Sequence, residues 1–338
     1  MPLSRHLLFP LASCTLLLAM VTPGEARPLA QNPGFGADLA ITTAVIQQTS
    51  QFNVDSDNEI TENLSNAGKN VTDATFFPLA RLDFTLQNLR TQFFVGNSRD
   101  NVGKGQFQIE LGATHQYPDQ TEITFAYFPK LPFLGETWKD PYLTNQVRET
   151  TDENAQGGRL ALNRIAGSQV SAEYAFAFSR IDDERSGVSL PGLSQTEQDS
   201  LHRDAHYQRL TIDYTLPISA EITLKPGVFY TQSDAKGASN SFDEYALRLQ
   251  TIYRHRQHLF TGTAQYASTL MDVTNPVFDR RQHDNRYSLF ALYNYFQPFG
   301  WKNWSIIGLG FIGKTDSTIA FYEQESAGIS LGVGYRWR

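Results

Sequence analysis

The stretch that decides the fold is GQFQIELGATHQYPDQTEITFAYFPK, residues 105–130. Apolar and polar residues alternate along it on both sides of the turn Pro118-Asp119-Gln120. Before the turn, one face carries Phe107, Ile109, Leu111, Ala113 and Tyr117. A period of two is typical of β-strands whose two faces meet different surroundings. The stretch therefore predicts a β-hairpin with one apolar face, which contacts either a protein core or lipid.

The same alternation recurs along the chain, and no helical period of any length accompanies it. Clear examples are RLDFTLQ (81–87), QVSAEYAFAFS (169–179), RLTIDYTL (209–216), EYALRLQTIY (244–253) and the final ISLGVGYRWR (329–338). Short connections, as at 88–90, 118–120, 217–220 and 255–257, alternate with long polar ones at 53–76, 130–157, 181–206 and 270–285. That order is typical of barrels with short periplasmic turns and long extracellular loops.

We therefore predict an all-β fold, a transmembrane antiparallel up-and-down β-barrel of about 14 strands. Weak strands near 91–97 and 158–166 leave a range of roughly 12–16 strands. A soluble β-sandwich also alternates, but three features favour the barrel. Charges recur on the polar faces, aromatic residues cluster near strand ends, and the chain closes on an apolar alternating strand whose Trp337 is followed by Arg338.

The first 26 residues resemble a secretory signal peptide. Arg5 and His6 precede the apolar run LLFPLASCTLLLAMV, and Gly24-Glu25-Ala26 offers small residues at a cleavage site. We predict a signal peptide over 1–26 and one outer-membrane barrel domain over 27–338. LASC, ending at Cys14, leaves lipoprotein processing as an alternative. Because 28 basic and 35 acidic residues give a net charge of −7, we expect no nucleic-acid partner.

The polar faces supply the candidate functional residues. If the apolar face contacts lipid, charged residues line the lumen; the candidates are Arg81, Asp83, Glu110, Glu122, Glu173, Arg209, Asp213, Glu221, Lys225, Glu244, Arg248 and Arg286, with Arg336 on the last strand. Buried charges are costly unless paired or hydrated. This set predicts a porin-like channel for small polar solutes. A closed structural or adhesion barrel acting through its loops fits as well, and inward-facing Phe128, Phe229, Phe290, Leu292 and Ile307 would favour a channel for hydrophobic solutes.

The long connection 130–157 is a candidate constriction loop, because long loops are commonly functional. We predict that it folds into the barrel mouth, with Trp138 and Tyr142 anchored against the wall and Lys139 and Asp140 near the charged ladders. An ordered outer cap is the alternative.

Several motifs invite other functions. GLGFIGKT (308–315) satisfies a phosphate-loop pattern, but no helix is expected after it. NVDSDNEI (53–60) resembles a calcium loop without its glycine, so weak divalent binding stays open. His202 with His206, and His255 with His258, lack further ligands. We therefore expect no enzyme, no cofactor and no metal site. The expected partners are outer-membrane lipids, lipopolysaccharide and a small solute.

Four segments also resemble a known family. They are SQFNVDSDNE (50–59), GETWKDPYLTNQVRETTDE (135–153), TNPVFDRRQHDNRYSLF (274–290) and GWKNWS (300–305). These segments resemble an uncharacterised family of Gram-negative outer-membrane proteins that is defined by a domain of unknown function. The resemblance spans nearly all of residues 33–338. It implies an outer-membrane barrel and supplies no catalytic residues.

Overall fold

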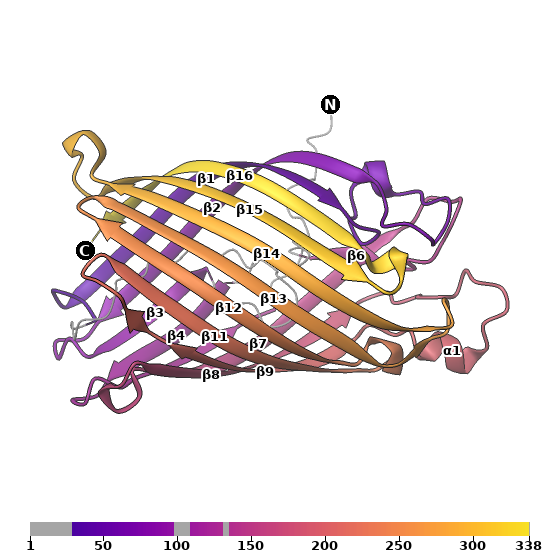
Figure 1. Ribbon diagram of the computed structural model, residues 1–338, viewed down its shortest axis with the longest axis horizontal. Helices are drawn as coiled ribbons and strands as arrows, with labels where there is room; N and C mark the ends of the chain where they lie inside the picture. Colours follow the sequence, from indigo (N-terminus) through magenta and orange to yellow (C-terminus); the bar gives the residue numbers. More distant parts are fainter. Residues whose placement is uncertain (1–28, 98–108, 131–134, 338) are drawn as a thin grey trace.

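The computed structural model describes residues 29–97, 109–130 and 135–337, and within them fourteen antiparallel strands close into a barrel (Figure 1). The wall consists of β1 (Gly34–Thr49), β2 (Asn70–Thr85), β3 (Thr91–Asn97), β4 (Ile109–Gln116), β5 (Glu122–Phe128), β7 (Thr150–Asn163), β8 (Val170–Ile181), β9 (Ala205–Tyr214), β11 (Ile222–Ala235), β12 (Phe242–His255), β13 (His258–Asn275), β14 (Arg280–Phe296), β15 (Trp304–Ser317) and β16 (Gln324–Trp337). Each strand pairs with its neighbours in sequence, and β1 pairs with β16 to close the ring. The predicted up-and-down barrel is confirmed.

Small elements decorate the ends of the wall. β6 (Glu136–Trp138) pairs with β7, and β10 (Leu216–Pro217) pairs with β11. The helix α1 (Gln195–Asp199) begins with a capping box between Ser194 and Glu197. Single 3₁₀ turns are η1 (Ser56–Asn58), η2 (Ile165–Gly167), η3 (Ala238–Asn240), η4 (Pro298–Gly300) and η5 (Ala320–Tyr322). No helix in the described ranges is long and apolar enough to cross a membrane.

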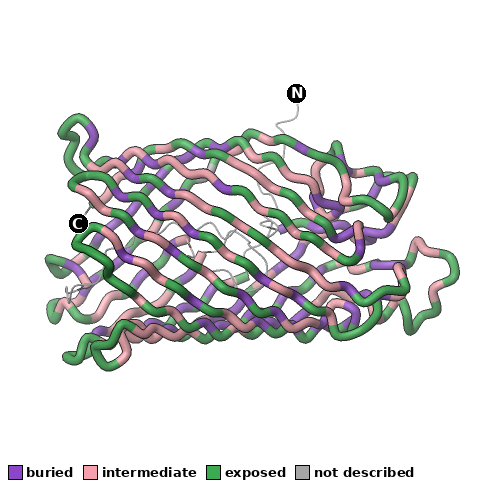
Figure 2. The backbone as a smooth tube through the Cα atoms, in the orientation of Figure 1, coloured by how far each residue is buried: buried purple, intermediate pink, exposed green. Residues whose placement is uncertain are grey.

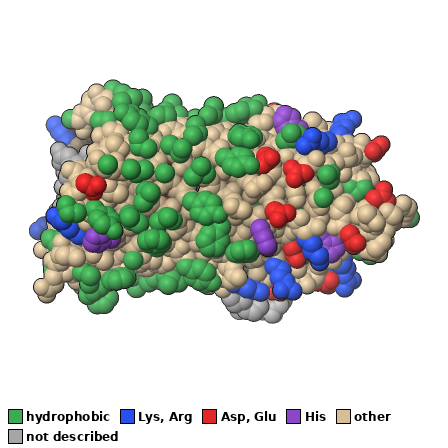
Figure 3. Space-filling model, turned by 90° about the horizontal axis from the view of Figure 1, so that it is seen from below, with side chains coloured by type: hydrophobic (Ala, Val, Ile, Leu, Met, Phe, Trp, Pro, Cys, Tyr) green, Lys and Arg blue, Asp and Glu red, His purple; other side chains and the backbone are tan. Residues whose placement is uncertain are grey.

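The apolar face of the opening hairpin lies outside the barrel. In β4 the side chain of Leu111 is 48% exposed, whereas its neighbour Glu110 is fully buried in the interior. Opposite Leu111, Tyr127 of β5 is also exposed. Figure 2 shows this alternation of exposure along the strands, and Figure 3 shows the resulting apolar belt on one face of the wall. A closed ring of paired strands with an apolar outer face satisfies the demands of a lipid interior, so this is a transmembrane barrel.

Exposed aromatic residues lie on the outer face toward both ends of the strands. Tyr245 and Tyr287 lie toward one end, and Tyr117, Trp301 and Trp304 lie toward the other. Such residues are typical of the two membrane–water interfaces.

The two ends of the barrel differ in their connections. At the turn end, where β1 begins and β16 ends, hairpins are closed by short segments such as 117–121 and 256–257. At the loop end lie the long segments 50–69, 135–149 and 182–204, with the shorter 236–241, 276–279 and 318–323. The N-terminal part of the opening stretch, residues 105–108, lies outside the described residues.

The predicted long loop 270–285 is wrong. β13 continues to Asn275 and β14 begins at Arg280, so only 276–279 connect them. β13 has 18 residues, whereas a strand needs roughly 10 to cross the hydrocarbon layer. Because the strands run on beyond the lipid belt, both of their faces become polar there and the alternation is lost. The same extension shortens the loops that were expected at 53–76, 130–157 and 181–206.

Candidate functional site

A first charged cluster lies on the inner face between β2 and β8. The buried carboxylate of Glu110 accepts from Arg81 at 3.2 Å and from Arg159 at 3.1 and 3.2 Å. Arg159 also donates to Glu173 at 2.8 Å. The Arg81 guanidinium lies 3.9 Å from the ring centroid of Phe94. Two arginines and two glutamates from four different strands thus neutralise one another within the wall.

A second cluster spans β9 to β14. Glu244 accepts from Arg286 at 2.5 Å, and Arg209 lies 3.9 Å away. Beside it, Arg248 pairs with Asp213 at 2.7 Å. Thr269 also donates to Glu244 at 3.0 Å. Three arginines here face Glu244, Asp213 and also Asp284, which lies close enough to Arg286 to interact with its charge, so positive and negative groups balance in this part of the lumen.

The remaining candidates are spread along the inner face. Buried Asp83 accepts from the Gln92 amide at 3.3 Å, and Glu122 pairs with Arg164 near the turn end. Lys225 lies partly buried on the inner face of β11. Glu221, in contrast, precedes β11 in an exposed turn.

Glu221 pairs with His255 at 2.6 Å at the turn end. His258 lies close by in sequence but donates to, or accepts from, Tyr293 at 2.7 Å. Both histidines therefore have side-chain partners, Glu221 and Tyr293, on the outer face of the barrel at the turn end.

Sequence reasoning missed three charges of these inner pairs, one of which is Arg164 beside Glu122. Arg159 joins Glu110 to Glu173, and Asp38 pairs with Arg336 at 2.6 Å. Both alternate with outward leucines, Arg159 with Leu160 and Asp38 with Leu39. That alternation was the available signal, but Gly157 and Gly158 weakened it in β7.

The lumen charges are partly exposed to solvent. In the two clusters and in the Arg164–Glu122 pair, the paired side chains are 10–24% exposed. Glu110 and Glu244 are the exceptions and are more deeply buried. An interior filled by side chains would leave nothing exposed. The partial exposure therefore describes a lumen wall whose charges are not sealed within packed side chains.

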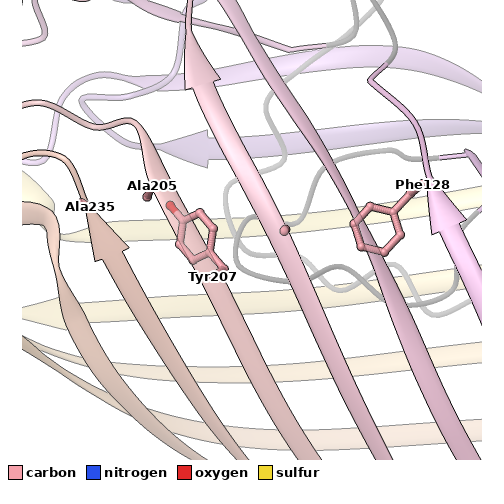
Figure 4. Packing of buried hydrophobic residues seen from close by; sticks show 5 residues of the cluster. Phe128, Ala205, Tyr207 and Ala235 are labelled. Carbon is pink, nitrogen blue, oxygen red and sulfur yellow. The ribbon is translucent and has the colours of Figure 1, made fainter.

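The inner wall also has apolar patches. One is formed by Ala40, Leu79, Leu292 and Ile307, with Phe290 and Leu309 against it. A second, nearer the loop end, contains Phe128, Ala177, Ala205, Tyr207 and Ala235. Figure 4 shows the rings of Phe128 and Tyr207 on the inner side of the strands. The inner face of the barrel thus carries both charged clusters and apolar patches.

A loop cap lies at the loop end; we define it as residues 50–69, 135–149, 182–204, 276–279 and 318–323. Its apolar core consists of Phe52, Leu64, Tyr142, Leu190, Leu193, Leu201, Val277, Phe278, Ile319, Phe321 and Tyr322. These residues come from five hairpins spaced around the ring. A core that is shared by loops from opposite sides of a barrel must lie over its mouth.

Polar bonds fasten the cap across the opening. Tyr142 and Tyr322 share a hydrogen bond of 2.7 Å between their hydroxyl groups. Their hairpins, β5–β7 and β15–β16, are separated on the ring by six strands one way and four the other. Burial raises the pKa of both tyrosines, so both are neutral at physiological pH. Asn275 donates to the Tyr322 hydroxyl at 2.8 Å.

Arg148 is a second fastening, 2% exposed and stacked 4.4 Å from the Trp138 ring centroid. Its guanidinium donates to the Gln51 carbonyl at 3.1 Å, to the Pro141 carbonyl at 3.3 Å and to the carbonyl of Asn58. Burial lowers the pKa of Arg148 to about 10, and only Asp140 counteracts this through space. A charged group therefore holds segments of two loops through neutral oxygens.

The candidate constriction residues lie in the cap. Trp138 donates to the Gln51 carbonyl at 3.0 Å, so its partner is a loop, where the sequence analysis placed it on the wall. Asp140 accepts from the backbone of Tyr142, Gly187 and Ser189. Lys139 pairs with Glu149 at 2.8 Å and Asp183 at 3.1 Å on the loop surface. The contacts with Gln51, Asp183, Gly187 and Ser189 come from other loops, and the sequence of one loop does not encode them.

The other motifs take structural places. GLGFIGKT lies within β15, which continues through it without a helix. In the 53–60 segment, Asp55 caps η1 by accepting from the Asp57 backbone. Within the described ranges, no group of three or more His, Cys, Asp or Glu is arranged to hold a metal ion. Residues 1–26, with Cys14, lie outside the described part of the chain.

Comparisons with known proteins identify a family and similar solved structures. A family model described as "Protein of unknown function (DUF2860)" matches residues 34–336. No curated protein matches the sequence. Similar solved structures include the CymD monoaromatic hydrocarbon channel, with a TM-score of 0.47, 11% identity and coverage of 91% of this chain and 90% of that chain.

Two further structures are a Pseudomonas aeruginosa FadL homologue (TM-score 0.44, 12% identity, 94% of this chain and 95% of that chain) and an anion-selective porin from Comamonas acidovorans (0.40, 10%, 90% and 98%). At these scores the likeness carries no inference about what this lumen conducts.

Proposed function

Because this chain belongs to the DUF2860 family of proteins of unknown function, its role must be argued from its own geometry, and we propose that it is an outer-membrane channel for small polar solutes. In this proposal the long loops face the outside of the cell and the turn end faces the periplasm, as is usual for such barrels. The residues 1–26 serve as the secretion signal.

The observation that carries the proposal is the partial exposure of the paired lumen charges. Ion pairs buried in a dry interior rarely repay the cost of removing them from water. Pairs such as Arg286–Glu244, with side chains 24% and 7% exposed, instead border water. They supply opposed charges along a path for polar solutes, while each charge keeps a partner when no solute is present.

The cap sets the access to this path. Its apolar core and its cross-mouth hydrogen bonds restrict entry to molecules that pass between the loops, or require the loops to part. We therefore propose that the channel has a low resting conductance that rises when the cap opens. The residues Trp138 and Tyr142 act in this scheme as parts of the cap.

The experiment is conductance of the refolded protein in a planar bilayer, with reversal potentials in a salt gradient. Stepwise conductance is the expected result, and because arginines and carboxylates balance in both lumen clusters the reversal potential should show only weak selectivity between anions and cations. Silence in both the intact protein and a variant lacking residues 136–147 of the cap would reject the channel and favour a closed barrel acting through its loops.

A channel for hydrophobic solutes is the second candidate. The inner patch of Leu79, Leu292 and Ile307, with Phe290 and Leu309, is the specific observation that favours it. Uptake of a small aromatic hydrocarbon into protein-containing vesicles distinguishes the two. Leu292→Asn should slow that uptake severalfold and leave ionic conductance unchanged if the patch is the path.

A further inference from the structure

An unassigned pocket lies on the outer wall at the loop end. It is half open, has a volume of about 590 Å³ and spans β7, β8, β9 and β11. Its basic lining residues are Lys130, Arg180 and Lys236. None of the three side chains makes an ion pair with any described residue, so their charge is available to a ligand.

Strand register brings two of these cations together. Arg180 is opposite Asn154 on β7, and the next strand pairs Ser179 with Ala205. Asp204 lies between Arg180 and Lys236, because its Oδ1 accepts from the Ile181 backbone at 2.8 Å and its carbonyl accepts from the Lys236 backbone at 2.8 Å. One carboxylate oxygen of Asp204 is therefore already engaged by the protein.

The apolar floor of the pocket is continuous with the lipid belt. Phe178 lies two residues before Arg180 on the same outer face. Phe176, two residues earlier, lies on that face further from the loop end. The ring of His206 meets Phe178 edge-on at 4.7 Å. Figure 3 shows the belt giving way to charged residues and histidines toward the loop end. The cations thus lie at the level of lipid headgroups.

We propose that this pocket binds the phosphorylated headgroup of a lipid A type glycolipid in the outer leaflet. An arginine and lysines with no partner suit phosphate, which accepts several charge-assisted hydrogen bonds. Against the three cations stand Asp204 and Asp234, so the balance is positive. Phe178 offers apolar contact to the first part of an acyl chain, which a soluble phosphate lacks. The proposal rests on the loops-outside orientation proposed above.

The test compares two double variants that remove the same charge. Arg180→Gln with Lys236→Gln removes the pocket cations. Arg90→Gln with Lys302→Gln removes two exposed cations at the turn end and is the matched control. Purified protein in detergent micelles is titrated with bisphosphorylated lipid A and followed by native mass spectrometry. Heat-modifiable mobility on SDS gels shows that each variant is folded.

We expect the pocket variant to bind lipid A about tenfold more weakly or worse and the control to stay within about twofold of the parent protein. Equal affinities of the two variants would overturn the proposal. So would complete displacement of lipid A by inorganic phosphate at equal phosphate concentration, or equally tight binding of phosphatidylglycerol. Lipid binding needs no conducting lumen, so a silent barrel that shows the expected difference rejects the channel and retains this site.

Discussion

Replacing Arg148 by methionine tests whether the cap is a fastened structure. Methionine fills much of the same volume but leaves the carbonyls of Asn58 and Pro141 without their donor. The Gln51 carbonyl keeps the Trp138 indole N–H. Two unpaired buried carbonyls cost about 2–6 kcal/mol, and the lost contact with Trp138 adds about 1 kcal/mol.

Relief of the buried charge offsets part of that cost. The pKa of Arg148 falls from 12.5 to about 10, which corresponds to about 3 kcal/mol of strain in the charged form. The net loss is thus about 2 kcal/mol of cap stability. That loss increases the open fraction of the cap by roughly 30-fold.

Two measurements test the Arg148→Met substitution. Limited proteolysis within residues 136–149 should accelerate in the Arg148→Met protein, and single-channel openings should become more frequent with unchanged ion selectivity. Arg185→Met is the matched control, because Arg185 lies on the same cap, is 58% exposed and pairs with Asp183 at the surface. If both variants are cleaved at the parent rate, Arg148 does not fasten the cap and the reasoning is refuted.

Three further changes test the wall, the lumen and the pH response. Leu111→Arg should cost roughly 2–4 kcal/mol of folding free energy in a denaturant titration, because a charge would enter the lipid face; an unchanged midpoint would contradict the assigned facing. Glu244→Gln should shift the reversal potential toward anions, since it removes a negative charge beside Arg286 and Arg209. In the cap, burial raises the pKa of Glu184, but the charge and hydrogen bonds of Arg203 outweigh this and hold it below 4.5. Its stabilisation is therefore full above pH 4.5 and is lost as the pH falls through the folded-state pKa, so channel openings should increase in acid, and Glu184→Gln should abolish that increase.

The barrel was predictable because lipid imposes a rule on each residue separately. Leu111 and Glu110 differ in the direction of their side chains, and their chemistry alone reveals which one faces lipid. The strand count followed from the same rule wherever the strand lies within the membrane. The rule did not give the strand boundaries at 270–285, because β13 and β14 continue there beyond the lipid and both of their faces are polar.

The sequence identified most of the charged lumen residues, but it did not show which of them form ion pairs. Glu110 and Arg159 are 49 positions apart and meet only through the register of β4, β5 and β7. A shift of one residue in any of these strands would turn the partners to opposite faces. The cap was less predictable still, because its core takes residues from five hairpins and no single loop carries a period.

Access and selectivity depend on different side chains in this barrel. The cap bonds of Tyr142, Arg148 and Arg203 end on loop atoms, among the residues described, whereas the lumen pairs around Glu110 and Glu244 lie between strands. Loosening a loop contact therefore changes how often the mouth opens without altering the charges that a solute passes. Neutralising a lumen charge changes which ions pass without releasing a loop. This separation means that opening frequency and reversal potential should vary independently, and a cap variant that changed both equally would show that the cap itself forms the selective constriction.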